Sequence, residues 1–177
     1  VGVLGASGLI YAEATRRHLE RVGEGLQRAA GVERQVLQHA DPATAPMTPL
    51  DLNDVIRRAA RFVESRREFR QVEFKLDLAD SAPVVRGSQV TLGQLFLNLL
   101  LNACEAQPGG GEVSIRSFVS EAIVHVEIAD RGSGVPPEET ARIFEPFYST
   151  KESAGLGLSV CHSIVRHHGG DIRVENR

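Results

Sequence analysis

Three side-chain amides recur at intervals of four residues in the most apolar segment of the sequence. Gln94, Asn98 and Asn102 lie between Leu92 and Ala103, where most other residues are apolar. This spacing places them on one face of a helix, so a polar stripe would follow a buried helix. Buried amides need partners, and neighbouring loops could supply them. The alternative is a ligand, since amide oxygens suit Mg²⁺, which shares its coordination positions with water and phosphates.

Two glycine-bearing segments lie further along the chain. Asp130 follows a predicted strand and precedes Gly132 and Gly134. Its carboxylate can accept a hydrogen bond from an exocyclic amine such as that of adenine, although such a segment taken singly is usually only a turn. Residues 155–158, Gly-Leu-Gly-Leu, open a predicted helix whose amino end is suited to phosphate. Lys151 lies just upstream, either solvated or able to close onto a terminal phosphate.

In this order the segments resemble the four boxes of the histidine kinase catalytic domain, within the ATP-binding fold shared with DNA gyrase, Hsp90 and MutL. The resemblance covers about residues 51–177. The matching segments are the N box at 94–103, the G1 box at 130–134, the F box at 144–148 and the G2 box at 155–158. Ser153 and Ala154 depart from the Gly-Thr that the family commonly has before the G2 box.

The resemblance implies a role for each of these residues. Asn102, helped by Asn98, would coordinate Mg²⁺, and Asp130 would bind the adenine amine of ATP. Phe144 and Phe147 would anchor a lid over the nucleotide. The residues expected to hold ATP are Asn98, Asn102, Asp130, Gly132, Gly134, Phe147, Lys151, Gly155, Leu156, Gly157 and Leu158. Those expected to position the γ-phosphoryl group for transfer are Gln94, Asn98 and Lys151.

The activity that the resemblance implies is that of an ATP-dependent protein-histidine autokinase in a two-component system. Its phosphoryl group would pass to an aspartate of a response-regulator partner. Residues 1–6 resemble the approach to the phosphoacceptor box, but the expected His-Glu and Asn-Pro do not follow them. This favours an alternative, a dimeric nucleotide-binding scaffold or pseudokinase that docks a partner. A serine kinase or clamp ATPase is a third hypothesis, disfavoured because Gln94 replaces the glutamate base of clamp ATPases.

The bulk composition excludes several classes of partner. With 20 Lys and Arg against 23 Asp and Glu, the 177-residue chain lacks the positive excess that nucleic acid binding requires. The longest apolar run, residues 95–101, is far shorter than the roughly 20 residues of a membrane span. Cys104 and Cys161 lie in apolar helical stretches, as buried thiols in a reducing compartment do. We expect a cytoplasmic location, although a longer parent protein could be membrane-anchored.

The chain divides into three predicted parts. Residues 1–45 resemble part of a dimerisation and phosphotransfer helical hairpin, and Leu19, Val22, Leu26 and Ala29 form a heptad-like seam there. This seam favours a homodimer through the N-terminal helices over packing of the helix on its own domain. Residues 46–50 are a predicted linker, because prolines end the helix nearby. Residues 51–177 form the predicted ATP-binding domain.

The order of the remaining elements predicts an α+β fold. We expect a two-layer α/β sandwich, a mixed sheet with helices on one face, preceded by the helical dimerisation arm. The predicted helices are 52–68, capped by Asp51, then 89–106, a short one at 138–143, and 156–167. The predicted strands are 72–78, a hairpin of 112–119 and 122–129 that turns at Ser120 and Glu121, and a last strand from Asp171.

Overall fold

The computed structural model describes residues 45–80, 83–140, 142–146, 148 and 156–176. All of them belong to one contact unit, Ala40–Arg177. The predicted dimerisation arm, residues 1–45, lies outside the described residues except for Ala45. Its helical pairing and the boundaries of the three predicted parts therefore stay predictions.

Helix α3 (Leu52–Glu64) begins where the sequence predicts and ends earlier. Asp51 Oδ1 accepts a hydrogen bond from the Asn53 backbone N–H at 2.8 Å, which caps the first turn. The predicted end near residue 68 is wrong. The Ser65 hydroxyl donates to the Phe62 carbonyl at 2.8 Å, and Arg66 takes up extended backbone before the 3-10 helix η1 (Arg67–Phe69). A serine that bonds the preceding turn thus ends the helix.

Helices α4 (Gln89–Glu105) and α5 (Gly157–His167) run antiparallel and pack on each other. The Cys161 thiol, midway along α5, donates to the Leu95 carbonyl of α4 at 3.8 Å. Beyond the carboxyl end of α5, His168 Nε2 accepts from the Ser88 backbone N–H, at the amino cap of α4, at 3.1 Å. The carboxyl end of α4 therefore meets the amino end of α5. Both helices lie within two residues of their predicted bounds.

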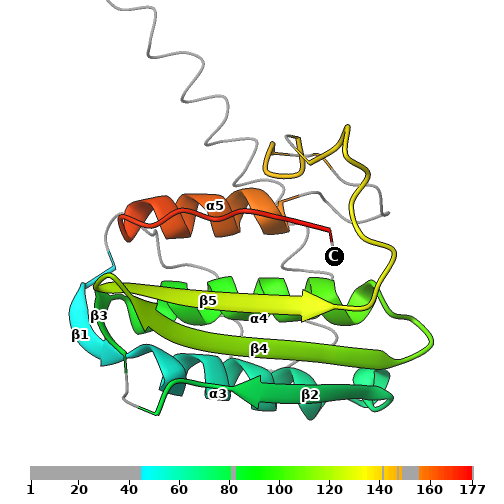
Figure 1. The fold of residues 1–177 in the computed structure, drawn as a ribbon, viewed down its shortest axis with the longest axis horizontal. Coiled ribbons are helices and arrows are strands. Elements are labelled where there is room, and N and C mark those ends of the chain that lie inside the picture. The colour runs from blue at the N-terminus through cyan, green and yellow to red at the C-terminus, as the bar shows by residue number, and fades with distance from the viewer. Residues whose placement is uncertain (1–44, 81–82, 141, 147, 149–155, 177) are drawn as a thin grey trace, which may run out of the picture. The chain divides into compact units, whose positions relative to one another are not determined.

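A mixed three-stranded sheet of order β2-β4-β5 forms the second layer. Strand β2 (Val72–Asp77) is parallel to β4 (Gly111–Ser120), which pairs antiparallel with β5 (Ile123–Asp130). Helices α3 and α4 lie behind this sheet in Figure 1, and α5 packs on α4. Val113 and Ile115 of β4 are buried in the core beneath the helices. The predicted α+β architecture, with helices on one face of a mixed sheet, is confirmed.

A second, two-stranded sheet was not predicted from the sequence. Strand β1 (Thr48–Asp51) pairs antiparallel with β3 (Val84–Gly87), with Leu50 opposite Val85. Residues 48–50 of β1 occupy part of the predicted linker. Pro49 made that segment resemble a linker, but an edge strand tolerates proline because one of its sides needs no ladder hydrogen bond.

Three local predictions are wrong. The hairpin turns at Glu121 and Ala122, one residue later than predicted, with φ of +51° and +63°. Residues 138–140 and 142–146 form successive turns instead of a helix, because most of their bonds join residues three apart, such as Arg142 N–H to the Glu139 carbonyl at 2.8 Å. Residues 171–176 have no ladder partner in the described part of the chain, so the last predicted strand is absent there.

Candidate functional site

The carboxamide of Asn102 lies beside the first residue of α5. A Cβ at position 157 would sit 3.9 Å from Asn102 Nδ2, which is an ordinary van der Waals distance, so the two residues are close neighbours. Leu156 at the amino cap of α5 makes no side-chain cap hydrogen bond, and helix amino ends are in general suited to anions. A carboxamide side chain and a helix amino end thus lie side by side, and amides and helix amino ends are both groups that bind phosphates and their metal ions.

Asn98, one turn earlier on α4, faces the middle of α5. A hydrogen bond between its side chain and Cys161 lowers the pKa of that thiol. Burial outweighs the bond and raises the pKa of Cys161 to about 12. Cys161 is therefore a neutral thiol at neutral pH, packed between α5 and α4.

Gln94 lies apart from the other two amides. Eight residues of helix separate it from Asn102, which corresponds to about 12 Å along the axis of α4. Its side chain is half-buried. The structure thus brings Asn102 and Gly157 together. Asn98 lies one turn away from Asn102, near the middle of α4, and Gln94 lies at the far end of the polar stripe.

The segment after β5 packs against the carboxyl end of α4. Asp130 Oδ1 accepts from the Gly132 backbone N–H at 2.8 Å, which closes a tight turn, while Oδ2 takes no hydrogen bond from the described residues. A Cβ at position 132 would lie 2.6 Å from Ala106 Cβ, so this close approach requires glycine. Gly134 has a φ of +70°, which also favours glycine. Asp130 and Asn102 therefore flank the same end of α4.

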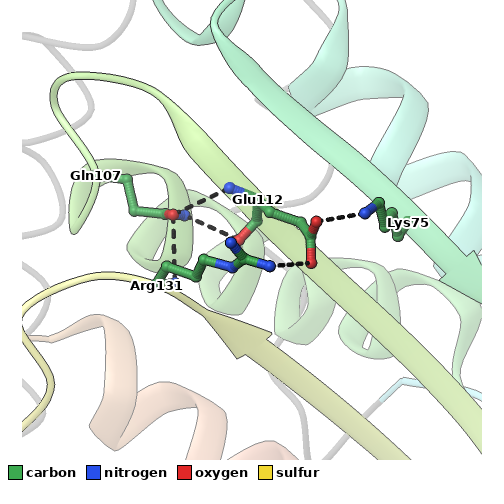
Figure 2. Close-up of polar contacts among 4 residues, drawn as sticks. All are labelled: Lys75, Gln107, Glu112 and Arg131. Atoms are coloured by element: carbon green, nitrogen blue, oxygen red, sulfur yellow. Dashed lines mark hydrogen bonds and ion pairs between the residues drawn. The ribbon is translucent and has the colours of Figure 1, made fainter.

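Gln107 is a buried polar residue of this region that was not among the predicted site residues. Its Oε1 accepts from the backbone N–H groups of Glu112 (3.1 Å) and Arg131 (3.2 Å), and its Nε2 donates to the carbonyls of Ala103 (3.2 Å) and Glu112 (3.3 Å), as Figure 2 shows in part. A single side chain thus joins α4, β4 and the residue after Asp130. Its polar character next to Pro108 was the only sequence signal.

Asn176 was also missed. Its Oδ1 accepts from the Val135 N–H at 2.9 Å and its Nδ2 donates to the Val135 carbonyl at 2.6 Å. The pairing joins two segments 41 residues apart in the chain, and a local sequence pattern carries no signal for such a contact.

A charge cluster on the outer face of the sheet borders the site. The Glu112 carboxylate accepts from Lys75 at 2.5 Å and from Arg131 at 3.4 Å, as Figure 2 shows. The hydrogen bond from Lys75 holds the pKa of Glu112 below its ordinary value, and the same bond raises the pKa of Lys75. The cluster ties Arg131 to β4 and β2.

The remaining predicted site residues divide into two groups. Leu156 precedes α5, and Gly157 and Leu158 form its first turn, all half-buried. The Phe144 ring packs on His162 of α5 with 5.6 Å between ring centroids. Phe147, Lys151 and Gly155 lie outside the described residues.

The donor set fits Mg²⁺ only with help from other ligands. Among the described residues no three His, Cys, Asp or Glu side chains converge on a metal position. Asn98 and Asn102 carry neutral amide oxygens, and Asn102 lies next to the amino end of α5. Mg²⁺ commonly binds with few protein oxygens, several waters and substrate phosphates, so this sparse set fits it.

Comparison with known proteins identifies the family to which this chain is similar. The model of the "Histidine kinase-, DNA gyrase B-, and HSP90-like ATPase" family matches residues 87–177, just over half of the chain. The sensor histidine kinase ZraS of Escherichia coli O157:H7 is 33% identical over 144 residues, which are 81% of this chain and 31% of ZraS. The chain thus spans about a third of the length of this curated relative.

Solved structures agree. The catalytic domain of histidine kinase ThkA is 32% identical with a TM-score of 0.69, over 74% of this chain and 88% of that one. Full-length ShkA, solved in complex with AMPPNP, is 26% identical with a TM-score of 0.69, over 99% of this chain and 37% of ShkA. No helix among the described residues is long and apolar enough to cross a membrane. The chain belongs to the histidine kinase, DNA gyrase B and HSP90-like ATPase family and carries the ATP-binding catalytic domain of the sensor histidine kinases.

Proposed function

We propose that this chain is the core of an ATP-dependent protein-histidine autokinase in a two-component system. The observation that carries the proposal is the meeting of Asn102, the Asp130 turn and the amino end of α5 at one end of α4. An adenine, its phosphates and a divalent cation need these three kinds of group close together. The likeness to ShkA, whose structure contains AMPPNP, supports the same ligand class.

Each part of the site has a proposed task. Asp130 Oδ2 accepts the adenine amine, and Gly132 and Gly134 leave room for the ring. Asn102 and Asn98 oxygens hold Mg²⁺, which when bound neutralises phosphate charge. The backbone of residues 155–158 and Lys151 hold the phosphates. Gln94 acts more remotely, because about 12 Å of helix separates it from Asn102.

The chemistry is a displacement at the γ-phosphorus. An imidazole nitrogen forms the new P–N bond while the bond to the β-phosphate oxygen breaks, ADP leaves and the imidazole loses a proton. The site residues hold the reacting groups in line. The phosphoryl group then passes to a response-regulator aspartate. We further propose that residues 1–45 form the homodimer and that the domain works in the cytoplasm.

Incubation with γ-labelled ATP and Mg²⁺ tests the proposal. The full chain is mixed with a helical hairpin that contains the His-Glu and Asn-Pro residues of the family's acceptor box. We expect label on the hairpin that is stable to base and lost in acid, as phosphohistidine is. Acid-stable label would instead indicate a serine kinase. Bound but unconsumed ATP would favour the scaffold alternative, and free phosphate without protein label a clamp ATPase.

The role of Asn102 has its own test. Asn102→Ala removes the metal-ligating oxygen, so we expect the affinity for ATP with Mg²⁺ to fall about tenfold or more. The affinity for ATP in EDTA should stay unchanged. Isothermal titration measures both, with Gln89→Ala at the exposed start of α4 as a control. Equal affinity of wild type and variant in Mg²⁺ would contradict the assignment.

A further inference from the structure

We propose that Gln107 and Asn176 are positioning residues that hold the adenine-binding segment, residues 130–135, from both ends. Through this segment they would set the orientation of the Asp130 carboxylate and so the preference of the site for adenine. The inference rests on the proposed function, because it assumes that Asp130 binds the adenine amine.

Gln107 fixes the start of the segment. The side chain is 6% exposed, and all of its hydrogen-bonding groups have protein partners. Three of these bonds join it to regular elements, one to Ala103 of α4 and two to Glu112 of β4. The bond from Arg131 N–H to Oε1 at 3.2 Å fixes the peptide group between Asp130 and Arg131 relative to both elements. A buried amide with every group paired has a single low-energy position, so the peptide is held firmly.

Asn176 fixes the other end of the segment. Both of its amide groups pair with the same residue, Val135, and this two-bond arrangement resembles one rung of a strand ladder. A Cβ at position 134 would lie 2.8 Å from Asn176 Oδ1, so Gly134 allows the close approach. The Asn176 side chain therefore links the segment to residues 171–176, which have no ladder partner among the described residues.

The segment leaves the sheet at Asp130, the last residue of β5, and beyond that residue few of its contacts are with buried groups. It contains two glycines, and Asp130, Arg131, Ser133 and Gly134 are all exposed. The turn bond from Gly132 to Asp130 Oδ1 is local and moves with the segment. The ion pair of Arg131 with Glu112 is exposed on the arginine side, where such pairs contribute little. Ordering the segment before the nucleotide arrives lowers the entropic cost of binding.

Two ligands distinguish positioning of the Asp130 carboxylate from general support of the fold. ATP has the 6-amino group that Asp130 would bind, whereas purine riboside triphosphate lacks it and is otherwise the same. Wild type should bind ATP more tightly than the analogue, and Asp130→Asn should lose this preference. The ratio of the two affinities reports the Asp130 contact alone, and general weakening of the site changes both affinities together.

The full chain is compared as Gln107→Met and Gln107→Glu, with Mg²⁺ present and affinities from isothermal titration. We expect Gln107→Met to bind ATP about tenfold more weakly while its affinity for the analogue stays unchanged, since one hydrogen bond to the amine is lost. Gln107→Glu keeps the oxygen that accepts from Arg131, so it should retain the preference for ATP. Equal weakening toward both ligands in Gln107→Met would overturn the role of Gln107.

Substitutions at Asn176 provide a second, independent test. The Asn176 side chain is exposed, so its replacement is not expected to unfold the protein. Asn176→Ala should lower the preference for ATP severalfold, and Asn176→Asp, which keeps the oxygen for Val135 N–H, should restore part of it. Unchanged preference in Asn176→Ala would overturn this half of the proposal. If wild type bound neither ligand, or if Asp130→Asn kept the wild-type preference, the proposed function of the site would fail instead.

Discussion

Side chains that carry the same carboxamide group have different roles in this domain. Asn102 and Gln107 are five positions apart and both carry a carboxamide. Gln107 has every amide group paired with protein, whereas Asn102 faces the glycine that opens α5. Asn98 lies between these extremes, since it is bonded to a buried thiol. The partners of an amide, and not its type, decide whether it supports the fold or is available to a ligand.

Cys161 makes a prediction at this scale. An unfolded thiol ionises near its ordinary pKa of 9.0, whereas burial raises the native pKa to about 12. The native state therefore keeps its proton more tightly, and the stability from this group is fully present below pH 9 and is lost as pH rises toward 12. We expect the free energy of unfolding to fall by about 1 kcal/mol per pH unit more in wild type than in Cys161→Ala above pH 9. Urea titrations between pH 8 and pH 10.5 measure this, and parallel curves would contradict it.

At the scale of elements, a buried polar cluster links the start of α3 to the sheet. Asn53 is 1% exposed and donates from Nδ2 to the Ala79 carbonyl at 3.0 Å. The Ser117 hydroxyl of β4 donates to Asn53 Oδ1 at 2.7 Å and accepts from Ala79 N–H at 3.0 Å. Each polar group in the cluster has a hydrogen-bond partner within it. The cluster therefore fixes the position of the start of α3 relative to β4.

Removal of Asn53 should therefore be costly. Asn53→Ala leaves the Ala79 carbonyl and the Ser117 hydroxyl buried without this partner, and we expect a loss of about 1–3 kcal/mol in the free energy of unfolding. Arg57→Ala in the same helix is the control, because its ion pair with Asp54 is exposed and should be worth about 0.5 kcal/mol or less. Denaturant unfolding compares the two. A cost for Asn53→Ala no greater than that of the control would show that the cluster is dispensable.

At the scale of the whole domain, one continuous apolar core joins the helices to the sheet. Ile56 of α3, Leu100 of α4, Ile164 of α5 and Ile115 of β4 are each at most 1% exposed and belong to the same cluster. The helix α4 carries the site residues and lies at the centre of this core, so packing holds Asn102 in place.

Leu100 tests this shared core. We expect Leu100→Ala to lower the free energy of unfolding by about 2–5 kcal/mol, because the cavity is surrounded by packed elements. The matched control is Leu76→Ala, since Leu76 is 42% exposed and should cost about 1 kcal/mol or less. Urea unfolding followed by circular dichroism measures both in a single transition. Similar costs would mean that the core relaxes around the deletion.

Much of this domain follows from local sequence pattern. Apolar spacing predicted α3, α4 and α5, because a helix that packs on one face needs apolar residues three and four apart. Alternation predicted β2, β4 and β5 for the corresponding reason. The amides of α4, the Asp130 turn and the glycines before α5 were recognisable because their chemistry lies in short, contiguous segments. Their roles in binding nucleotide stay predictions.

Tertiary structure decided the features that depend on distant partners. Two of these features need a neighbour that lies elsewhere in the chain, namely the pairing of β1 with β3 and the contact of Asn176 with Val135. A third, the turn at Glu121 and Ala122, needs a backbone conformation that these residue types rarely adopt. Gln107 is the clearest case, because the same glutamine would be an ordinary surface residue if β4 and residue 131 did not close around it. Local periodicity determines the elements, whereas the free energy of burying and pairing polar groups is decided only when remote segments meet.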